Sequence, residues 1–374
     1  MKYSLVLLII TVKFSIAQVR FFVSPTGNDQ HKGSIQQPFK TLQQAIKVAS
    51  TQKGKNVIIV LKKGIYYPGN TITIHTDKFL PSSLLITSNN NETVTISAGK
   101  PLTPKWKPWQ NGIYVTEVPA GIAFERLYVN NVLQPLARYP NYDSSARVFH
   151  GTAANAIAPE RVKKWKNPVG GYIHALHAHE WGGFHYRITG ADSSGNLQME
   201  GGWQNNRPNK MHEQYRFVEN IFEELDAPGE WWLDRNKNLL YYYPPKAIDI
   251  AKATIIVARL KNSIELKGTE TKPLKNIRIS GIHFTHNERS FMDTKEPLLR
   301  SDWTIYRGGV ILMDGTEHCK ISDCVFEGIG GNAIMVSNYN KHDTITGCHI
   351  YNTGANAVCF IGDTKAVRSP SFGY

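Results

Sequence analysis

Two aspartates, Asp314 and Asp363, each follow an apolar, β-type run and are the best candidates for acid, base or nucleophilic chemistry. Two carboxyl groups about 5 to 10 Å apart can together cleave a glycosidic bond. The cations Lys365 and Arg368, which follow Asp363, could hold its carboxylate ionised or bind an anionic sugar. A lone aspartate at a turn usually forms or caps that turn. For each acid considered alone, the structural role is therefore favoured over the catalytic one.

A second set of candidate functional residues lies in the histidine-rich stretch 174–181 (HALHAHEW) and just after it. Aromatic rings stack on the apolar faces of sugar rings, and polar side chains bond to the hydroxyl groups. We therefore expect a sugar-binding surface here, although two alternatives stay open: a metal site on neighbouring histidines, and a core role for the aromatic residues. The expected substrate-binding residues of this stretch are His179, Trp181, His185, Tyr186 and Arg187.

The elements that must position these residues include a repeat near the C-terminal end. The final two copies of each repeated pattern are 24 residues apart, and two β-type runs within such a period are typical of one coil of a parallel β-helix. One coil carries an insertion of about 20 residues, centred on 286–307. The patterns are 279–284 (ISGIHF), 321–326 (ISDCVF) and 345–350 (ITGCHI), and 309–312 (GVIL), 332–335 (NAIM) and 356–359 (NAVC).

Equivalent positions of a β-helix stack about 4.8 Å apart, so the repeat also predicts which side chains share a ladder. We expect two inward ladders, one of Ile282, Cys324 and Cys348 and one of Phe284, Phe326 and Ile350. On the same reasoning Asp314 and Asp363, about two coils apart, should lie roughly 10 Å apart on one side. The 179–187 segment would then form the opposite wall of a cleft.

The N-terminal region carries a resemblance to a known superfamily. Residues 22–29 (FVSPTGND), Gly33-Ser34 and 38–45 (PFKTLQQA) resemble the N-terminal cap of secreted right-handed parallel β-helix proteins of the pectate lyase-like superfamily. Within this stretch, Thr41 is the expected N-cap of a short helix. The resemblance covers about the first hundred residues and implies the fold more specifically than the reaction.

The middle of the chain, 116–245, lacks the repeat and is rich in tryptophan and tyrosine. It is predicted to be a β-rich insert, with 235–238 (RNKN) as a hairpin turn. Three segments resemble those of β-helix glycosidases such as family 120 β-xylosidases and family 141 glycoside hydrolases. They are 124–130 (FERLYVN), 229–234 (GEWWLD) and 240–245 (LYYYPP). This resemblance implies a glycoside hydrolase.

Residues 1–17 predict a secretory signal peptide, because Lys2 precedes a short apolar run and small residues occupy the expected cleavage site. Secretion or export to a periplasm is therefore expected, and no run is long enough to predict a transmembrane helix. The formal net charge is +13, or +11 once the two lysines of residues 1–17 are removed. Such a charge fits an anionic glycan or simply a basic surface, while no nucleic-acid-binding motif occurs.

The four cysteines, Cys319, Cys324, Cys348 and Cys359, all fall in the last repeats. Small buried apolar residues are the favoured interpretation, a Cys324–Cys348 disulfide is the alternative, and no metal site is expected. A polysaccharide lyase of the same fold is the alternative enzyme. It would use Ca²⁺ and a Lys or Arg base, but no dense cluster of aspartates is present, nor are the paired aspartate motifs of polygalacturonase-like enzymes. A glycan-binding or surface protein without catalysis is the third possibility.

The sequence thus predicts an all-β protein, a right-handed parallel β-helix with a short cap helix. The expected divisions are a signal peptide at 1–17, the cap and first coils at 18–115, the insert at 116–245, and further coils at 246–374. We also expect the chain to be truncated after its last coil, with coils and part of the site missing. The expected function is hydrolysis of a polysaccharide or oligosaccharide, without a cofactor.

Overall fold

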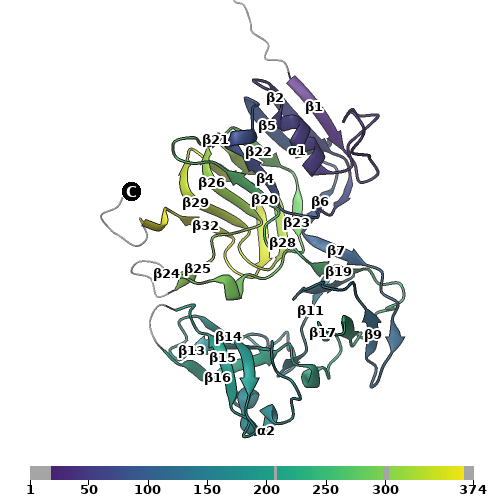
Figure 1. Cartoon of the computed structure of the whole chain (residues 1–374), viewed down its shortest axis with the longest axis vertical. Coiled ribbons are helices and arrows are strands. Elements are labelled where there is room, and N and C mark those ends of the chain that lie inside the picture. The colour runs from purple at the N-terminus through teal and green to yellow at the C-terminus, as the bar shows by residue number, and fades with distance from the viewer. Residues whose placement is uncertain (1–17, 206–208, 298–302, 366–374) are drawn as a thin grey trace, which may run out of the picture.

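The structure is a computed structural model that describes residues 18–205, 209–297 and 303–365. The predicted signal peptide, 1–17, lies outside the described residues. The described chain is mostly β-structure with few helices, in agreement with the predicted all-β class. It forms a lobe of parallel sheets, here called the parallel lobe, and a lobe of antiparallel sheets built by residues 99–258, here called the antiparallel lobe (Figure 1).

Three parallel sheets make up the parallel lobe. The first contains β1 (Gln18–Val23), β2 (Asn56–Leu61), β5 (Ser83–Ser88), β22 (Ile277–Ser280), β27 (Lys320–Ser322) and β30 (Thr344–Thr346). The second contains β3 (Gly64–Tyr66), β6 (Val94–Ser97), β23 (His283–Thr285), β28 (Val325–Ile329) and β31 (His349–Thr353). The third contains β4 (Ile72–His75), β20 (Ile264–Lys267), β26 (Ile311–Glu317), β29 (Ile334–Lys341) and β32 (Val358–Ile361), with β21 (Leu274–Lys275) beside β26.

The chain visits these sheets in rotation, as β26, β27 and β28 and then β29, β30 and β31 show. Ile279 pairs with Ile321, which pairs with Ile345, so the repeats found in the sequence stack in register. The 42-residue step from Ile279 to Ile321 is longer because residues 286–297 and 303–310, here called the bridging segment, lie outside the three parallel sheets. This segment holds the turn η4 (Phe291–Asp293) and the strands β24 (Glu296–Pro297) and β25 (Thr304–Ile305), which confirms the predicted insertion.

The core of the parallel lobe is formed by inward residues of all three sheets. Phe284, Phe326 and Ile350 pair across neighbouring strands, as predicted. Ile282 and Cys324 are buried and Cys348 packs against the same core, so the predicted ladder of these three residues is also confirmed. The four cysteines are free thiols, and the disulfide considered as an alternative is not formed.

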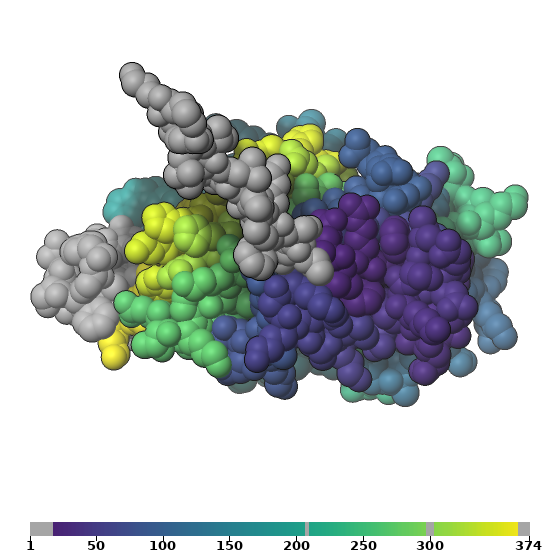
Figure 2. Space-filling view, turned by 90° about the horizontal axis from the view of Figure 1, so that it is seen from above, coloured from purple at the N-terminus to yellow at the C-terminus, as the bar shows by residue number. Residues whose placement is uncertain are grey.

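The helix α1 (Leu42–Ser50) covers the N-terminal part of the parallel lobe, and the purple residues in Figure 2 include it. Its N-cap is Thr41, as predicted, since the Thr41 side chain accepts a hydrogen bond from the Gln44 amide. Leu42, Ala45, Ile46 and Ala49 form its buried stripe. Among the described residues, no helix is long and apolar enough to cross a membrane.

The antiparallel lobe holds three sheets, and the predicted insert 116–245 falls inside it. The sheet nearest the junction contains β7 (Gly99–Leu102), β10 (Leu127–Val129), β11 (Val132–Gln134) and β19 (Ile255–Ala258). A second contains β8 (Lys107–Pro108), β9 (Tyr114–Glu117), β17 (Trp231–Asp234) and β18 (Leu239–Tyr242), where β17 and β18 form the hairpin expected around 235–238. The third, the five-stranded sheet, contains β12 (Arg138–Tyr139), β13 (Tyr172–His177), β14 (Gly183–Ala191), β15 (Leu197–Gly201) and β16 (Met211–Glu219).

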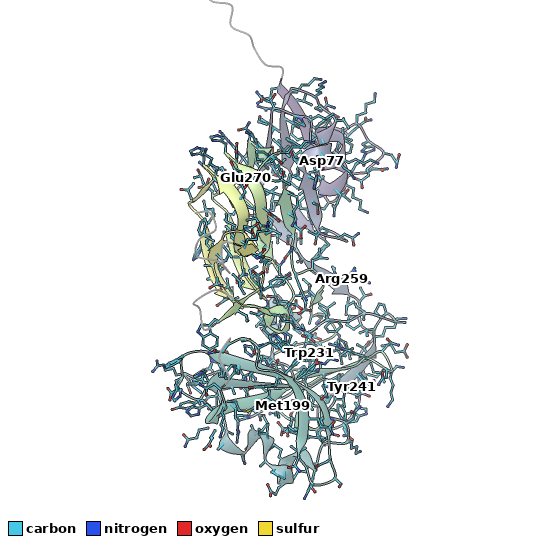
Figure 3. All side chains as sticks on the ribbon, turned by 60° about the vertical axis from the view of Figure 1, so that its left-hand side comes forward. Asp77, Met199, Trp231, Tyr241, Arg259 and Glu270 are labelled. Carbon is cyan, nitrogen blue, oxygen red and sulfur yellow. The ribbon has the colours of Figure 1, made fainter. Side chains whose placement is uncertain are left out.

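The remaining short elements of the chain are single helical turns. They are η1 (Thr76–Lys78) in the parallel lobe and η2 (Ala154–Ile157), α2 (Pro159–Val162) and η3 (Phe222–Glu224) in the antiparallel lobe. The labelled residues Met199, Trp231 and Tyr241 mark the antiparallel lobe, and Arg259 marks the junction (Figure 3). The two lobes are therefore joined both by the strands β7 and β19 and by the bridging segment, whose contacts form the site described next.

Candidate functional site

A cavity of about 200 Å³ lies where the antiparallel lobe, the bridging segment and the parallel lobe meet. We call it the interlobe cavity. It combines aromatic rings with amide, hydroxyl and imidazole groups, and none of its lining residues in the described part of the chain carries a carboxylate. Its lining residues are Gly183, His185 and Gln204 from the antiparallel lobe, Ser290, Phe291, Thr294 and Trp303 to Tyr306 from the bridging segment, and Asn332 with Gly354, Ala355 and Asn356 from the parallel lobe.

Gln204 offers a hydrogen-bond donor to this cavity. The residue is 5% exposed, and its Oε1 accepts a hydrogen bond of 3.2 Å from the His185 backbone amide. Its Nε2 is buried and makes no hydrogen bond within the described part of the chain. A buried donor without a partner costs free energy, so Gln204 is suited to bond to an oxygen atom of a bound molecule.

Asn332 forms the opposite, fully bonded wall. Its Nδ2 donates to the carbonyl oxygens of Tyr306 and Gly308, at 3.1 and 2.9 Å. Its Oδ1 accepts from the backbone and side-chain nitrogens of Asn356, both at 3.1 Å. Asn332 therefore fixes the bridging segment against the last described strands, which defines the shape of the cavity.

One face of the five-stranded sheet is directed at the bridging segment. Antiparallel pairing places His174 opposite both His185 of β14 and Phe217 of β16, and Tyr172 opposite Glu219. Because alternate residues of a strand share a face, these five side chains lie together. The opposite face carries Ile173, Ile188 and Val218, which form an apolar core.

Arg289 of the bridging segment binds two carboxylates on this face. Its Nη1 donates to Glu219 Oε1, and its Nη2 donates to Glu125 Oε2 at 3.0 Å. The guanidinium also lies 4.6 Å from the Phe291 ring centroid, within cation–π range. Tyr172 donates to Glu125 Oε1 at 2.5 Å, and His174 Nε2 lies 3.0 Å from Glu219 Oε1. The result is a buried ion network that joins the two lobes.

The electrostatics of this network depend on the balance between burial and charge pairing. For Glu219, burial opposes ionisation, but Arg289 and then His174 outweigh it and lower the pKa. The same balance, with Arg289 and the Tyr172 hydroxyl, lowers the pKa of Glu125. Both carboxylates are therefore ionised at neutral pH. For Glu288 burial prevails and raises the pKa.

The pKa of His185 is lowered well below its usual range, first by burial and then by the neighbouring His174 and Arg289. His185 is consequently neutral at neutral pH. A neutral imidazole has one nitrogen that donates and one that accepts, so the orientation of its two nitrogens decides what it offers to the cavity.

The two predicted catalytic aspartates lie elsewhere, on the third parallel sheet. Asp314 pairs in register with Ser337 of β29, which pairs with Ile361 of β32, two residues before Asp363. Asp314 Oδ2 lies 3.3 Å from Lys267 Nζ, and its Oδ1 accepts from Asn338 at 2.8 Å. Asp314 of β26 and Asp363, which follows the end of β32, therefore lie two strands apart with β29 between them, and neither is a lining residue of the interlobe cavity.

Asp363 is exposed, and its Oδ1 accepts a hydrogen bond of 2.7 Å from the Lys365 backbone amide. This hydrogen bond gives Asp363 the turn-forming role that is usual for a lone aspartate at a turn. Nearby, Arg307 pairs with Glu296 at 2.7 Å and donates to the Gly362 carbonyl at 2.8 Å, which ties the bridging segment to the end of β32. Arg368 lies outside the described residues.

Of the predicted substrate-binding residues of the antiparallel lobe, His185 lines the interlobe cavity. Trp181 is 59% exposed and stacks on His177 at 5.1 Å, beside the exposed His179. Tyr186 packs toward the apolar core on the opposite face of β14, and the exposed Arg187 lies 3.8 Å from Glu200. The expected wall from His179 to Arg187 is thus divided between two faces of the sheet.

Sequence reasoning did not identify Glu219, Arg289 or Gln204 as site residues. Arg289 contacts Glu125, a residue 164 positions earlier, so no local spacing connects them. Two of the sequence features described above include site residues. Glu125 lies in the segment 124–130, and Arg289 lies in the predicted insertion 286–307. Within the described ranges there is no group of three or more His, Cys, Asp or Glu residues placed to hold a metal ion.

A larger cavity of about 670 Å³ lies wholly within the antiparallel lobe. Its aromatic wall consists of Trp109, Phe222, Trp232 and Tyr241, which contact one another at 4.8 to 5.9 Å between ring centroids. Phe222, Trp232 and Tyr241 belong to the small hydrophobic core of that region with Ile113 and Leu225, whereas Trp109 is 40% exposed. We therefore regard them first as a folding core.

Comparison with known proteins supports the fold. No known family model matches this chain, and no curated protein matches its sequence. A solved structure described as "Glycoside hydrolase" matches with a TM-score of 0.72 and 20% identity over 88% of this chain. This chain spans 65% of the length of that structure's chain. A second, "The complex structure of XylC with xylose", matches at a TM-score of 0.47 and 14% identity, over 87% of this chain and 42% of that one. The chain therefore has a fold similar to that of a glycoside hydrolase.

Proposed function

We propose that this chain is a secreted carbohydrate-active enzyme that hydrolyses a polysaccharide or oligosaccharide. We further propose that its three parallel sheets are the faces of a right-handed parallel β-helix of the pectate lyase-like superfamily. Rotation of the chain through the sheets and the 24-residue repeat support this interpretation. The similarity of the fold to a glycoside hydrolase supports the class of activity.

The interlobe cavity is the observation that carries the proposal. A sugar ring needs an apolar surface for its C–H faces and separate donors and acceptors for its hydroxyl groups. Phe291 and Trp303 supply the first, and Gln204, His185 and Thr304 supply the second. Gly182 leaves room for this arrangement, because a Cβ atom at that position would lie 2.6 Å from the Trp303 ring.

For the bond-cleaving groups we propose Asp314 and Asp363, with Lys365 and Arg368 as the cations that recruit an anionic glycan. Positions in register two strands apart in a parallel sheet are separated by roughly 10 Å, and Asp363 lies two residues beyond the position in register with Asp314. The expected separation is therefore at or beyond the upper end of the spacing used by inverting glycosidases. The exposed residues His179, Trp181 and Arg187 are proposed to contact more distant sugar units, whereas Tyr186 packs toward the apolar core of the sheet. Increasing salt concentration should weaken binding of an anionic glycan, because exposed charges are screened.

Substitution of Asp363 by asparagine tests the assignment directly. It preserves size and the hydrogen bond to Lys365, but it removes the charge, so turnover should fall by about a hundredfold or more if Asp363 is an acid, base or nucleophile. The matched control is Asp143→Asn, since exposed Asp143 makes the same kind of bond, 2.8 Å to the Ser145 amide. Near-normal turnover by Asp363→Asn would leave Asp363 as a turn residue.

The products distinguish hydrolysis from the alternatives. Incubation of the full chain with a panel of neutral and uronic acid-containing glycans should release reducing ends without forming an unsaturated sugar. A calcium-dependent, ultraviolet-absorbing unsaturated product would instead identify a polysaccharide lyase. Binding without either product would identify a glycan-binding protein. Export is tested separately, by N-terminal sequencing of the protein recovered outside the cytoplasm, where the mature chain should start at Gln18.

A further inference from the structure

The interlobe cavity is connected to the buried ion network through two histidines. His185 Nδ1 lies 2.7 Å from His174 Nδ1, and His174 Nε2 lies 3.0 Å from Glu219 Oε1. His185 Nε2 makes no side-chain contact of hydrogen-bond length within the described residues. An added Cβ atom at Gly183 would lie 3.5 Å from this nitrogen, so glycine there leaves its approach from the cavity open. The chain of contacts therefore runs from Glu219 through His174 and His185 to the cavity.

The hydrogen-bond partners of His174 and His185 determine which ring nitrogens carry hydrogen. Glu219 is ionised and can only accept, so His174 must donate through Nε2. A neutral His174 then has Nδ1 as its acceptor, and His185 Nδ1 must carry the hydrogen of the 2.7 Å bond. A neutral His185 with hydrogen on Nδ1 exposes a lone pair at Nε2. The cavity is thus offered a hydrogen-bond acceptor that cannot rotate into a donor.

Adding one proton to this pair has the same result wherever the charge lies. If His185 carries the charge, both of its nitrogens bear hydrogen. If His174 carries it, His174 donates through both nitrogens, and the hydrogen of His185 must be on Nε2. In either case the incoming proton is found on His185 Nε2, while the positive charge can lie beside Glu219.

We propose that His185 and His174 form a two-histidine proton relay, in which His185 Nε2 accepts the proton of a hydroxyl group bound in the interlobe cavity. The O–H bond breaks and its electron pair stays on the oxygen. The new N–H bond forms at His185 Nε2 while the Nδ1 hydrogen of His185 passes to His174 Nδ1. His185 would be the catalytic base, and His174 and Glu219 would be positioning residues.

The groups around the pair favour this direction of transfer. Burial and Arg289 disfavour a lasting charge on His185, whereas His174 lies directly against the Glu219 carboxylate. Arg289, Glu125 and Tyr172 complete the charged and titratable surroundings, and the Arg289 backbone amide donates a hydrogen bond to the Glu288 carboxylate. Gln204 Nε2, the unpartnered donor described above, can hold the oxygen whose proton is removed.

The chemical class of the bound group follows from this donor and acceptor. His185 Nε2 and Gln204 together fit a neutral hydroxyl compound, either an alcohol group of a sugar or a water molecule held next to one. The choice of a sugar rests on the proposed function, whereas the protonation pattern of the two histidines does not. The two can therefore be tested separately.

Ring-nitrogen NMR of the full chain, labelled with ¹⁵N-histidine, reads the protonation pattern without any ligand. Signals are assigned with His185→Gln and His174→Gln. At neutral pH we expect His185 Nδ1 and His174 Nε2 to carry hydrogen and His185 Nε2 to carry none. A hydrogen on His185 Nε2 at neutral pH would overturn the proposal.

Glu219→Gln tests whether the carboxylate sets this pattern. A glutamine can donate as well as accept, so the His185 Nε2 signal should move toward that of a mixture of tautomers. Glu200→Gln is the control, because exposed Glu200 lies on β15 and contacts Arg187 rather than the histidines. An unchanged His185 Nε2 signal in folded Glu219→Gln would contradict the role of Glu219.

The activity measurement follows once a glycan is turned over. His185→Gln retains hydrogen bonding but cannot take up a proton, so kcat should fall by about a hundredfold or more, while exposed His349→Gln should not change it. His174→Gln should cause a smaller loss and alter the pH profile. Normal kcat in His185→Gln would overturn the relay and leave the proposed hydrolase intact. If no glycan is cleaved, the proposed hydrolase fails and the NMR result still decides the relay.

Discussion

Replacing Arg289 with methionine should lower the free energy of unfolding by about 3–5 kcal/mol, because it removes the cation from a buried charge network. Arg289 contacts both Glu219 and Glu125, and the Arg289 side chain is 16% exposed. Methionine keeps much of the apolar stem but leaves two carboxylates without their main counter-charge. Arg289→Lys should recover part of the loss, since a single ammonium group cannot bond to both carboxylates in the same planar geometry.

The stability of the natural protein and that of Arg289→Met should depend on pH in opposite directions. In the natural protein the pKa values of Glu219 and Glu125 are lowered. Their contribution to stability is therefore present above the unfolded-state pKa and is lost as the pH falls through the folded-state values. In Arg289→Met burial is no longer opposed by the arginine, so the pKa values should rise. Stability should then decrease as the pH rises through the ordinary pKa that glutamate has in the unfolded chain, about 4.5.

Denaturant unfolding at several pH values measures both effects. All eight tryptophans lie between Trp106 and Trp303, so tryptophan fluorescence reports the antiparallel lobe and the bridging segment. Arg187→Met is the matched control, because Arg187 and Glu200 are exposed partners 3.8 Å apart and such pairs contribute about 0–1 kcal/mol. Equal stability of Arg289→Met and Arg187→Met would show that the network does not hold the lobes together.

Phe326→Ala should lower the free energy of unfolding of the parallel lobe by about 3–5 kcal/mol, the usual cost of removing a buried phenylalanine ring. Phe326 is fully buried and stacks on Phe284 with ring centroids 5.1 Å apart and an interplanar angle of 11°. Its neighbours belong to continuous strands on both sides, so they cannot easily close the space that the ring leaves. The loss of stability should therefore include a cavity term in addition to lost burial.

His349→Ala is the control for this position. His349 is exposed and pairs in register with Val325, so it lies one residue before the same ladder but points outward. Its replacement should change stability by no more than about 0.5 kcal/mol. Outside the bridging segment, the parallel lobe contains no tryptophan. Its unfolding is therefore measured by far-ultraviolet circular dichroism and not by tryptophan fluorescence. Similar unfolding midpoints for Phe326→Ala and His349→Ala would contradict the inward ladder.

The two inward ladders could be predicted because they depend on residue types within short stretches of the sequence. Each repeat carries the same apolar positions at a constant interval, and alternate residues of a strand must face opposite sides. The inward positions of Phe284, Phe326 and Ile350 follow from that alternation alone. The Thr41 cap and the hairpin at 235–238 were predictable for the same reason, since each depends on residue types only a few positions apart.

The interlobe site could not be predicted in this way. Glu125, Glu219 and Arg289 are far apart in the sequence, and each has an ordinary local setting. Antiparallel pairing of β13, β14 and β16 brings His174, His185 and Glu219 to one face of a sheet. Only the return of the bridging segment across that face adds Arg289 and closes the cavity.

By itself, the sequence determined the all-β class, the stacked repeats with their inward ladders, and the position of the segment that leaves them. These depend on the period of apolar residues and on local turn chemistry, which short stretches of chain encode. Only the tertiary structure decided that His185 faces a cavity while Tyr186 packs in a core, and that two glutamates share one arginine. Those outcomes depend on which distant segments pack together, because burial and charge pairing act between residues that are neighbours in space and not in sequence.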